Sequence, residues 1–341
     1  MGHEQKLKFN ALKYYKASIL KELFFDGLLF LTVASLFFLI TTLENYYLLA
    51  GSSILLGLLS IQVVLVFHDC MHESLTKNKM FNVTIARIIG TFYMCPFHFI
   101  KSSHMSHHRH ASDHELDTEM LHLSEELAQK RTWGKLLNKI GQSIFAPILF
   151  APILHLSHFL DWIKGEKKMH KDLMKNTVID IALILIFWSI LGLELVSKGI
   201  LAKTLIFGVF IPFIIGLSLV YIAASPLHSM MYVGDTKNMN PVCKQILIRR
   251  TFDSKRGFFS IFLSNFNYHL EHHLYPNVNR WELKKLALAL RPELINFAKD
   301  QQLPLMIHAD FNSWYKTYLK HRTEVNSCTT VESWKKINRV F

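Results

Sequence analysis

The chain has 341 residues and a formal net charge of +12, and half of its residues are apolar. Charged residues make up only 19%, below the roughly 25% of an average soluble protein. The positive charge does not require a nucleic-acid partner, because basic loops are expected beside anionic lipid head groups. The four cysteines show neither a CxxC pair nor the spacing of a disulfide framework, which argues against a disulfide-stabilised fold.

The first elements along the chain are a basic helix and two apolar runs. Residues 1–23 carry Tyr15 and Ile19 at helical spacing and predict a cytoplasmic amphipathic helix. Residues 24–41 and 46–67 have the length and composition that a bilayer-spanning helix needs. The second run leads directly into a histidine-rich motif. We therefore predict two membrane spans, with this motif at the membrane surface.

Further along the chain, two more apolar runs follow a broken one. Residues 82–100 are interrupted by charged, glycine and proline residues, which favours a re-entrant or interfacial segment. His98 within it is interpreted as structural or substrate-facing. Residues 177–196 and 204–224 predict the third and fourth spans. The alternative, a large soluble core, is disfavoured because helices that are apolar on all sides are hard to bury in one chain. With no repeat and no linker, the whole chain is predicted to be a single domain.

Lysine and arginine predict which segments face the cytoplasm. Residues 1–23, 68–175 and 225–341 contain 5, 14 and 17 of them, and only Lys198 and Lys203 lie in the turn between the last two spans. By the positive-inside rule, the three basic segments are cytoplasmic. An even number of spans agrees, because it returns the chain to the side on which it began. We expect an integral, multi-pass membrane protein with both termini and all histidine motifs on the cytoplasmic side.

Three short motifs concentrate the histidines, namely HDCMH at 68–72, HMSHH at 104–108 and HLEHH at 269–273. Residues three and four positions apart share one face of a helix, so each motif directs two or three imidazoles the same way. Chance pairing among 19 histidines is the alternative, but it does not readily produce three such motifs beside apolar segments. The motifs predict metal ligands at His68, His72, His104, His107, His108, His269, His272 and His273.

Ligand number narrows the choice of metal. Eight imidazoles exceed the four ligands of one zinc ion and suit two metal ions. Imidazole binds iron, copper and zinc alike, so ligand type alone leaves the metal open, while ligand number and the absence of thiolates favour binuclear iron. A carboxylate-bridged di-iron bundle would need two ExxH motifs, and the sequence has one, from Glu119 to His122.

The strings HDCMHES at 68–74, HMSHHRH at 104–110 and NYHLEHHLYP at 267–276 resemble those of the membrane fatty-acid desaturase and hydroxylase superfamily. The resemblance covers about residues 40–290. It implies an all-α, polytopic membrane protein with four transmembrane helices and a cytoplasmic helical cap that holds a histidine-ligated di-metal site. It also implies two iron ions as cofactors, O₂ as co-substrate and no catalytic residue beyond the metal ligands.

The resemblance implies further site residues. Members of the superfamily have a ninth histidine ahead of the third motif, and His228 matches its position, with a lone interfacial histidine as the alternative. Relatives of the stearoyl-CoA type place an asparagine one helical turn earlier, where this chain has Ala224, so Asn265 and Asn267 are candidate substitutes. Carboxylates near the motifs are candidates for orienting the ligands, with an ordinary surface position as the alternative. These carboxylates are Asp69, Asp113, Asp117 and Glu271.

The activity implied by the resemblance is O₂-dependent desaturation of a fatty acyl chain held as a lipid or a thioester. The sequence has no cytochrome b5-like HPGG and no Gly-rich dinucleotide motif, so the electrons are expected from a separate donor such as ferredoxin or cytochrome b5. A hydroxylase or ketolase acting on a lipid or carotenoid is the alternative within the superfamily. A membrane metal transporter would place its ligands inside the spans, and a haem protein needs only paired axial histidines, so both are disfavoured.

Overall fold

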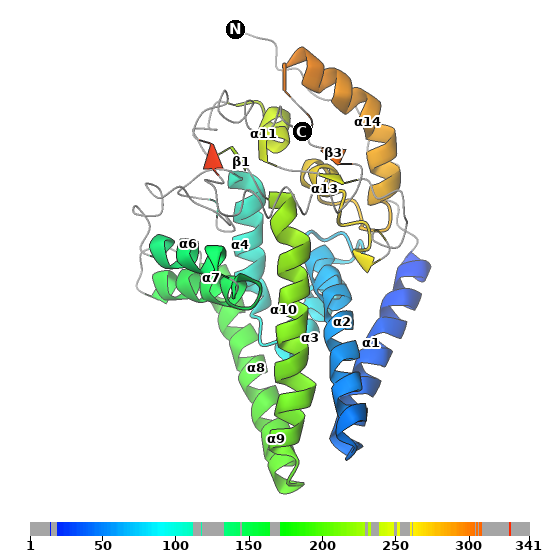
Figure 1. The fold of residues 1–341 in the computed structure, drawn as a ribbon, viewed down its shortest axis with the longest axis vertical. Coiled ribbons are helices and arrows are strands. Elements are labelled where there is room, and N and C mark those ends of the chain that lie inside the picture. The colour runs from blue at the N-terminus through cyan, green and yellow to red at the C-terminus, as the bar shows by residue number, and fades with distance from the viewer. Residues whose placement is uncertain are drawn as a thin grey trace. The chain divides into compact units, whose positions relative to one another are not determined.

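The computed structural model is almost entirely helical, with short strands of two residues each (Figure 1). It packs as two compact units. Residues 18–102 and 158–221 form the first, named here the span unit, and residues 1–17, 103–157 and 222–341 form the second, the histidine unit. The structure describes residues 14, 19–111, 117, 133–143, 145–163, 171–228, 231–232, 239–248, 251–252, 260, 262–303, 305, 307–308 and 327–328.

The span unit is built from long apolar helices. They are α1 (Ile19–Thr42), α2 (Tyr46–Met71), α3 (Lys79–Phe92), α8 (Lys171–Ser197), α9 (Leu201–Thr204), the π-helix η2 (Leu205–Phe210) and most of α10 (Ile211–Ala224). Among the described residues, four segments are long and apolar enough to cross a membrane, namely Phe24–Thr42, Tyr46–Met71, Lys171–Ser197 and Leu201–Ala224. The four expected spans are thus confirmed. The helix expected over residues 1–23 lies outside the described residues, except for Tyr14 and the part from Ile19 that continues into α1.

Polar side chains close the turns that join the spans. Asn45 caps α2, and its Oδ1 accepts hydrogen bonds from two amides of the first turn at 2.9 and 3.2 Å. Lys203 Nζ donates to the carbonyl oxygens of Thr41 and Leu43 at 3.1 and 2.8 Å. The end of a helix leaves such carbonyls without intrahelical partners, so Lys203 stabilises the end of α1 from the start of the fourth span.

The second and fourth spans pack closely through small residues. A Cβ atom at Gly57 would lie 2.7 Å from Cβ of Ile215, so only glycine fits in this part of α2. Four residues earlier, Ser53 Oγ donates to the carbonyl oxygen of Phe207 at 2.6 Å. Phe207 lies in η2, where the wider π-helical turn disturbs the regular hydrogen-bond ladder. Ser53 therefore supplies a donor to the irregular stretch of a span that has no water around it.

The broken apolar segment forms two helices joined by a sharp bend. The axes of α3 and α4 (Phe97–His110) are bent by 109° across residues 93–96, the geometry of a broken span or a re-entrant loop. Met94 adopts the left-handed conformation, with φ of 55°. The Cys95 amide donates to the carbonyl of Gly90 at 2.7 Å, and a Cβ at Gly90 would lie 2.3 Å from the Cys95 carbonyl oxygen. The bend thus depends on glycine at position 90.

The histidine unit combines shorter helices and paired strands. Besides the end of α4, its elements are α6 (Gly134–Gln142), most of α7 (Ala146–Ile163), the 3₁₀-helix η3 (Ser225–His228), β1 (Met231–Tyr232), α11 (Pro241–Ile248), β2 (Thr251–Phe252), α13 (His269–Leu274), α14 (Leu283–Asp300), β3 (Ile307–His308) and β4 (Ser327–Cys328). Strand β1 pairs in parallel with β4, and β2 with β3. Leu270 of α13 packs in a core with Ile246 of α11 and Leu290 of α14, and Figure 1 shows α13 between these helices.

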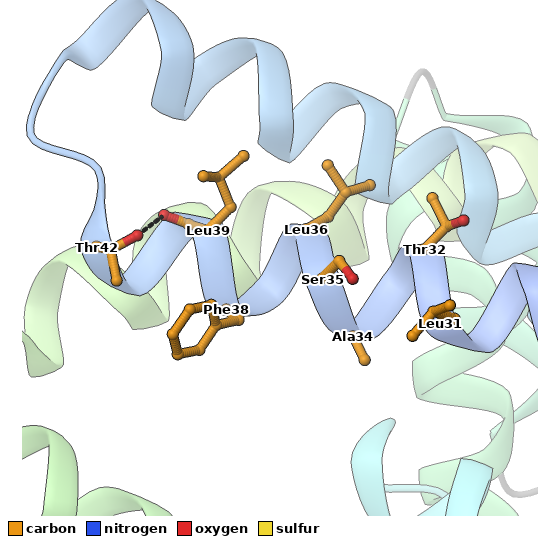
Figure 2. Close-up of a pocket in the computed structure, with 8 residues that line it drawn as sticks. All are labelled: Leu31, Thr32, Ala34, Ser35, Leu36, Phe38, Leu39 and Thr42. Carbon is orange, nitrogen blue, oxygen red and sulfur yellow. Dashed lines mark hydrogen bonds between the residues drawn. The ribbon is translucent and has the colours of Figure 1, made fainter.

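A groove of about 700 Å³ runs along α1. Figure 2 shows that its lining comes from this one helix, with Leu31, Ala34 and Phe38 pointing away from α2. The hydroxyls of Thr32 and Thr42 donate to carbonyls of α1 itself, at 2.8 and 3.0 Å. The groove therefore offers an apolar surface without titratable or metal-binding groups.

Candidate metal centre

The second histidine motif lies on α4, a single helix that places its imidazoles one turn apart. His104 and His108 bring their Nε2 atoms within 3.1 Å of each other. Metal–nitrogen bonds of about 2.1 Å at a right angle place two ligand atoms about 3.0 Å apart. The spacing between these two nitrogens therefore fits two ligands of one metal ion.

The third motif lies on the short helix α13. His269 and His273 are also one turn apart, and their Nε2 atoms are 3.1 Å from each other. Both side chains are buried. Leu270, on an adjacent face of the helix, is fully buried in the core with α11 and α14. The apolar side of α13 thus holds the helix in place, and its histidine side is left for ligand binding.

His228 joins the third motif from a distant part of the sequence. It ends η3, the turn that follows the fourth span. Its Nε2 lies 2.9 Å from Nε2 of His269, although 41 residues separate the two. His228 is buried. It therefore lies beside a histidine of the third motif and out of solvent.

Six histidines of the histidine unit form one cluster with two sets. His104, His108 and His272 form the His108 set, and each has a ring nitrogen within 4.8 Å of the others. His228, His269 and His273 form the His228 set, linked by the Nε2 contacts of 2.9 and 3.1 Å. The rings of His108 and His273 stack with centroids 3.9 Å apart, which places the two sets side by side.

His107 belongs with the His228 set. Its ring centroid is 5.2 Å from that of His228 and 5.3 Å from that of His273. The side chain is fully buried. Two sets of converging imidazoles, one of them with an adjoining fourth ring, have the donor chemistry and the spacing for two metal ions.

The first motif lies in the span unit, at the end of α2. His68 is in the last turn of this helix, and His72 caps it. Their ring centroids are 4.7 Å apart, their ring nitrogens lie within 4.8 Å of each other, and both side chains are buried. The HxxxH spacing thus gives the pair of neighbouring imidazoles that the sequence predicts.

Asp117 is a carboxylate that contacts a histidine of the cluster. His107 Nδ1 donates to Asp117 Oδ1 at 2.7 Å, and both side chains are almost completely buried. A carboxylate can only accept, so Nδ1 carries the proton and Nε2 is left with its lone pair. Such a hydrogen bond fixes the ring and raises its basicity as a ligand. Asp113, the alternative only four residues earlier, lies outside the described residues.

Glu271 is buried and accepts a hydrogen bond from Thr251. The threonine hydroxyl donates to Glu271 Oε2, and both side chains are buried. Thr251 is in β2, which also forms an antiparallel bridge to Tyr268, the residue before the third motif. The sequence gives no sign of this contact, because the two residues lie 20 positions apart. Asp69 is buried at the end of α2, in the first motif.

The two asparagines near the third motif have different surroundings. Asn265 Nδ2 donates to the carbonyl of Arg280 at 3.1 Å, which ties the loop before the motif to the loop after it. Ser264 and Asn265 both adopt left-handed conformations, with φ of 47° and 65°. Asn tolerates this conformation better than most residues. The Asn265 side chain is thus used in shaping the loop, while Asn267 is fully buried one residue before Tyr268.

His98 has a partner outside the cluster. Its Nδ1 and its backbone amide both donate to Asp180 of α8, each at 2.8 Å. These two hydrogen bonds support the structural role expected for His98. Asp180 is a charged residue within the apolar run 177–196, and the sequence gives no indication of which residue pairs with it.

The comparisons with known proteins agree with this geometry. The fatty acid desaturase family model matches residues 44–304. An sn-1 acyl-lipid omega-3 desaturase (ferredoxin) from Synechocystis sp. is 23% identical over 84% of this chain and 78% of that protein. A fatty acid conjugase from Calendula officinalis is 21% identical over 71% of this chain and 67% of its own length. A Delta(12) fatty acid dehydrogenase from Crepis alpina is 24% identical over 76% of this chain and 70% of its own length.

The family match includes all three histidine motifs and covers more than half of the chain. It agrees with the four apolar span-length helices and with a buried histidine cluster able to bind metal. The chain is therefore an oxidoreductase that belongs to the fatty acid desaturase family.

Proposed function

We propose that this protein carries out O₂-dependent desaturation of a fatty acyl chain at a histidine-bound di-iron centre, with electrons from a separate donor. The observation that carries the proposal is the pair of histidine sets in contact through the stacked rings of His108 and His273, 3.9 Å apart. A single metal site would need one set. A soluble-type di-iron site would need bridging carboxylates, whereas the donors here are imidazoles.

The proposed ligands are the nine histidines named from the sequence. We assign His107 and the His228 set to one metal position. The other takes the His108 set together with His68 and His72, the pair at the end of α2. The ligands are His68, His72, His104, His107, His108, His228, His269, His272 and His273. Imidazole donors suit iron.

The protein's own residues hold and orient the proposed ligands. Asp117 holds His107 in the tautomer that leaves Nε2 free for metal. Glu271, held by Thr251, fixes the backbone of α13 between His269 and His272. Bound iron would supply the reduction of O₂ and the removal of hydrogen from adjacent carbons. In the net reaction, the acyl chain loses two hydrogens, the donor gives two electrons, two protons are taken up and O₂ leaves as two waters.

The relatives support a lipid-linked substrate and a protein donor. One similar protein is an acyl-lipid desaturase whose name includes ferredoxin, and another is an omega-3 fatty acid desaturase of the endoplasmic reticulum. We propose an acyl lipid or acyl thioester as substrate, and ferredoxin, cytochrome b5 or a similar carrier as donor. A hydroxylase would share the same metal centre, so the product has to separate the two reactions.

Mass spectrometry of lipids from a host that expresses the chain tests the proposal. Wild-type protein is expected to produce acyl chains that lack two hydrogens, and His272→Ala is expected to produce none. His155→Ala serves as the matched control, because this histidine lies on α7, outside the three histidine motifs. Acyl chains that gain an oxygen instead would show that the reaction is hydroxylation and not desaturation. Active protein with stoichiometric zinc and no iron would refute the di-iron centre.

We also propose that residues 1–23, 68–175 and 225–341 face the cytoplasm, because they contain 36 of the 38 basic residues. Single cysteines in place of Ser124, Ser197 and Ser333 test this orientation with a membrane-impermeant thiol reagent. The first and third positions should react from the cytoplasmic side, and Ser197 from the opposite side. Labelling of Ser124 and Ser333 from different sides would contradict the orientation.

A further inference from the structure

Asp180 is a buried carboxylate within the third span. Its side chain is 3% exposed. Its Oδ1 accepts from Arg87 Nε at 2.8 Å, and its Oδ2 accepts from Nδ1 and the backbone amide of His98, each at 2.8 Å. A charge inside a membrane segment is costly unless it is paired and fully hydrogen-bonded. Asp180 meets that condition, and its partners show where it acts.

The carboxylate acts on the first turn of α4. This helix begins at Phe97, after Pro96, so the residue before it has no polar side chain to cap the first amides. Amides at the start of a helix lack intrahelical acceptors and favour a negative charge nearby. Asp180, from a different helix, accepts the His98 amide and so replaces the missing local cap.

Helix α8 also supplies a hydrogen-bond partner for the backbone on the other side of the bend. Trp188 Nε1 donates to the carbonyl oxygen of Thr91, in the last turn of α3, at 2.9 Å. Asn176 Oδ1 accepts from Arg87 Nη2 at 3.1 Å, one turn before Asp180. Both helix ends at the 109° bend thus have partners on α8, as backbone groups at membrane depth require.

We propose that Asp180 is a positioning residue for the metal centre, because it fixes the start of the helix that carries His104, His107 and His108. His98 precedes His104 by six residues, about 9 Å along the helix axis at 1.5 Å per residue. Ligands need to be held to within about 0.5 Å, so a shift or rotation at the start of α4 would displace the imidazoles from their metal. This inference rests on the proposed function, which assigns the three histidines as ligands.

The test compares two substitutions that differ in a single acceptor. Asp180→Ala alone would leave the Arg87 guanidinium, whose side chain is 25% exposed, without its carboxylate partner, so both variants are made with Arg87→Gln. In this background, Asp180→Asn keeps an oxygen that can accept the His98 amide, and Asp180→Ala removes it. Asp172→Asn and Asp172→Ala are the matched controls, because Asp172 is exposed in the first turn of the same helix.

The readouts are iron per folded chain, the visible spectrum after loading with Co²⁺, and turnover. The Asn variant should stay close to the Arg87→Gln parent in iron content and spectrum. The Ala variant should lose at least about half of its iron, show an altered Co²⁺ spectrum and turn over about 10–100-fold more slowly, the range known for groups that orient ligands. If the Ala variant does not fold, Asp180→Ser takes its place, because the serine hydroxyl is too short to reach the amide.

Equal iron content and identical Co²⁺ spectra in the parent and the Ala or Ser variant would overturn the positioning role. A loss of thermal stability with an unchanged spectrum would overturn it as well, because Asp180 would then only hold the fold. Wild-type protein that takes up neither iron nor Co²⁺ would instead refute the proposed function itself, and the positioning role with it.

Discussion

The His108 set and the His228 set use the same ligand chemistry but are assembled over different distances along the chain. His104 and His108 meet because they lie one turn apart on α4, a helix of 14 residues. His228 and His269 meet only because the chain returns after 41 residues to the end of α10. Each set nevertheless joins a pair of histidines one turn apart on one helix to a third histidine from a distant segment. His272, 164 residues after His108, completes the first set, and His228 completes the second. Removing that third histidine from each set in turn tests how far each depends on the tertiary fold.

The largest effect is expected from His272→Ala, which removes the only residue of the His108 set that is not on α4. His272 is the only donor that α13 contributes to this metal position, where His68, His72, His104 and His108 would remain. Its loss should lower the iron content and, because catalysis demands tight ligand geometry, abolish turnover. Elemental analysis of the purified protein together with a lipid assay measures both. Retained iron at the wild-type level would contradict the assignment of His272 as a ligand.

His228→Ala should reduce the binding of iron less than it reduces catalytic activity. His107, His269 and His273 remain, so part of the iron should stay bound. Catalysis demands tighter geometry than binding does, so activity should drop at least about 100-fold. The iron loss should be smaller than for His272→Ala. The controls are His155→Ala and His158→Ala, two histidines of α7 outside the three motifs. If His228→Ala behaves like them, the ninth ligand lies elsewhere.

Asp117→Asn tests the support of the His228 set through His107. The amide can still accept a hydrogen bond, but it no longer carries the charge that raises the basicity of the ring, so we expect a 10–100-fold loss of activity. Asp300→Asn, at the exposed end of α14, is the matched control. Turnover within twofold of wild type for both variants would make Asp117 an ordinary buried carboxylate.

Thr251→Val probes the support of α13 without touching a histidine. The change preserves shape but leaves the buried Glu271 carboxylate without the threonine hydroxyl, so the free energy of unfolding should fall by about 1–3 kcal/mol. Thr251→Ser keeps the hydroxyl and should lose less. Thermal unfolding followed by circular dichroism measures the difference, and equal melting temperatures for Val and Ser would contradict this role.

The smallest effect concerns the ion pair that ties α4 to the turn after the first motif. Lys101 Nζ lies 2.9 Å from Glu73 Oε1, and this hydrogen bond lowers the pKa of Glu73 from its usual 4.5. The stabilisation is complete above pH 4.5 and is lost as pH falls through the lowered pKa of the folded state. The pair is partly exposed, so it contributes at most about 1 kcal/mol. The melting temperatures of wild type and Glu73→Gln should converge at low pH.

Several features of this molecule could be predicted because they follow from local sequence. The four spans are apolar runs of the right length, and the structure confirms them. The pairs His104–His108 and His269–His273 follow from helical spacing. The family assignment, made from three motifs, is confirmed by the match over residues 44–304.

Other features could not be predicted because they depend on how distant segments pack. Nothing in the composition singles out His228, which was proposed from resemblance alone. Asp113 and Asp117 were equivalent candidates by position, and only the fold gives Asp117 its contact with His107. Similarly, Asp180 was visible as a charge in an apolar run, but its partners lie more than 80 residues away.

The π-helical turn η2 can absorb the loss of one residue from the fourth span. A π-helical turn contains an extra residue relative to an α-helix, and each residue of an α-helix advances the chain by about 100°. Deleting one residue from 205–210 should therefore convert η2 to regular α-helix and leave α10 in its present orientation. Ile215 and Gly216 would keep their places against Gly57 and Ser60. Deleting one residue of α10 ahead of Ile215 would instead rotate both by about 100°, so deletions there should be far less tolerated.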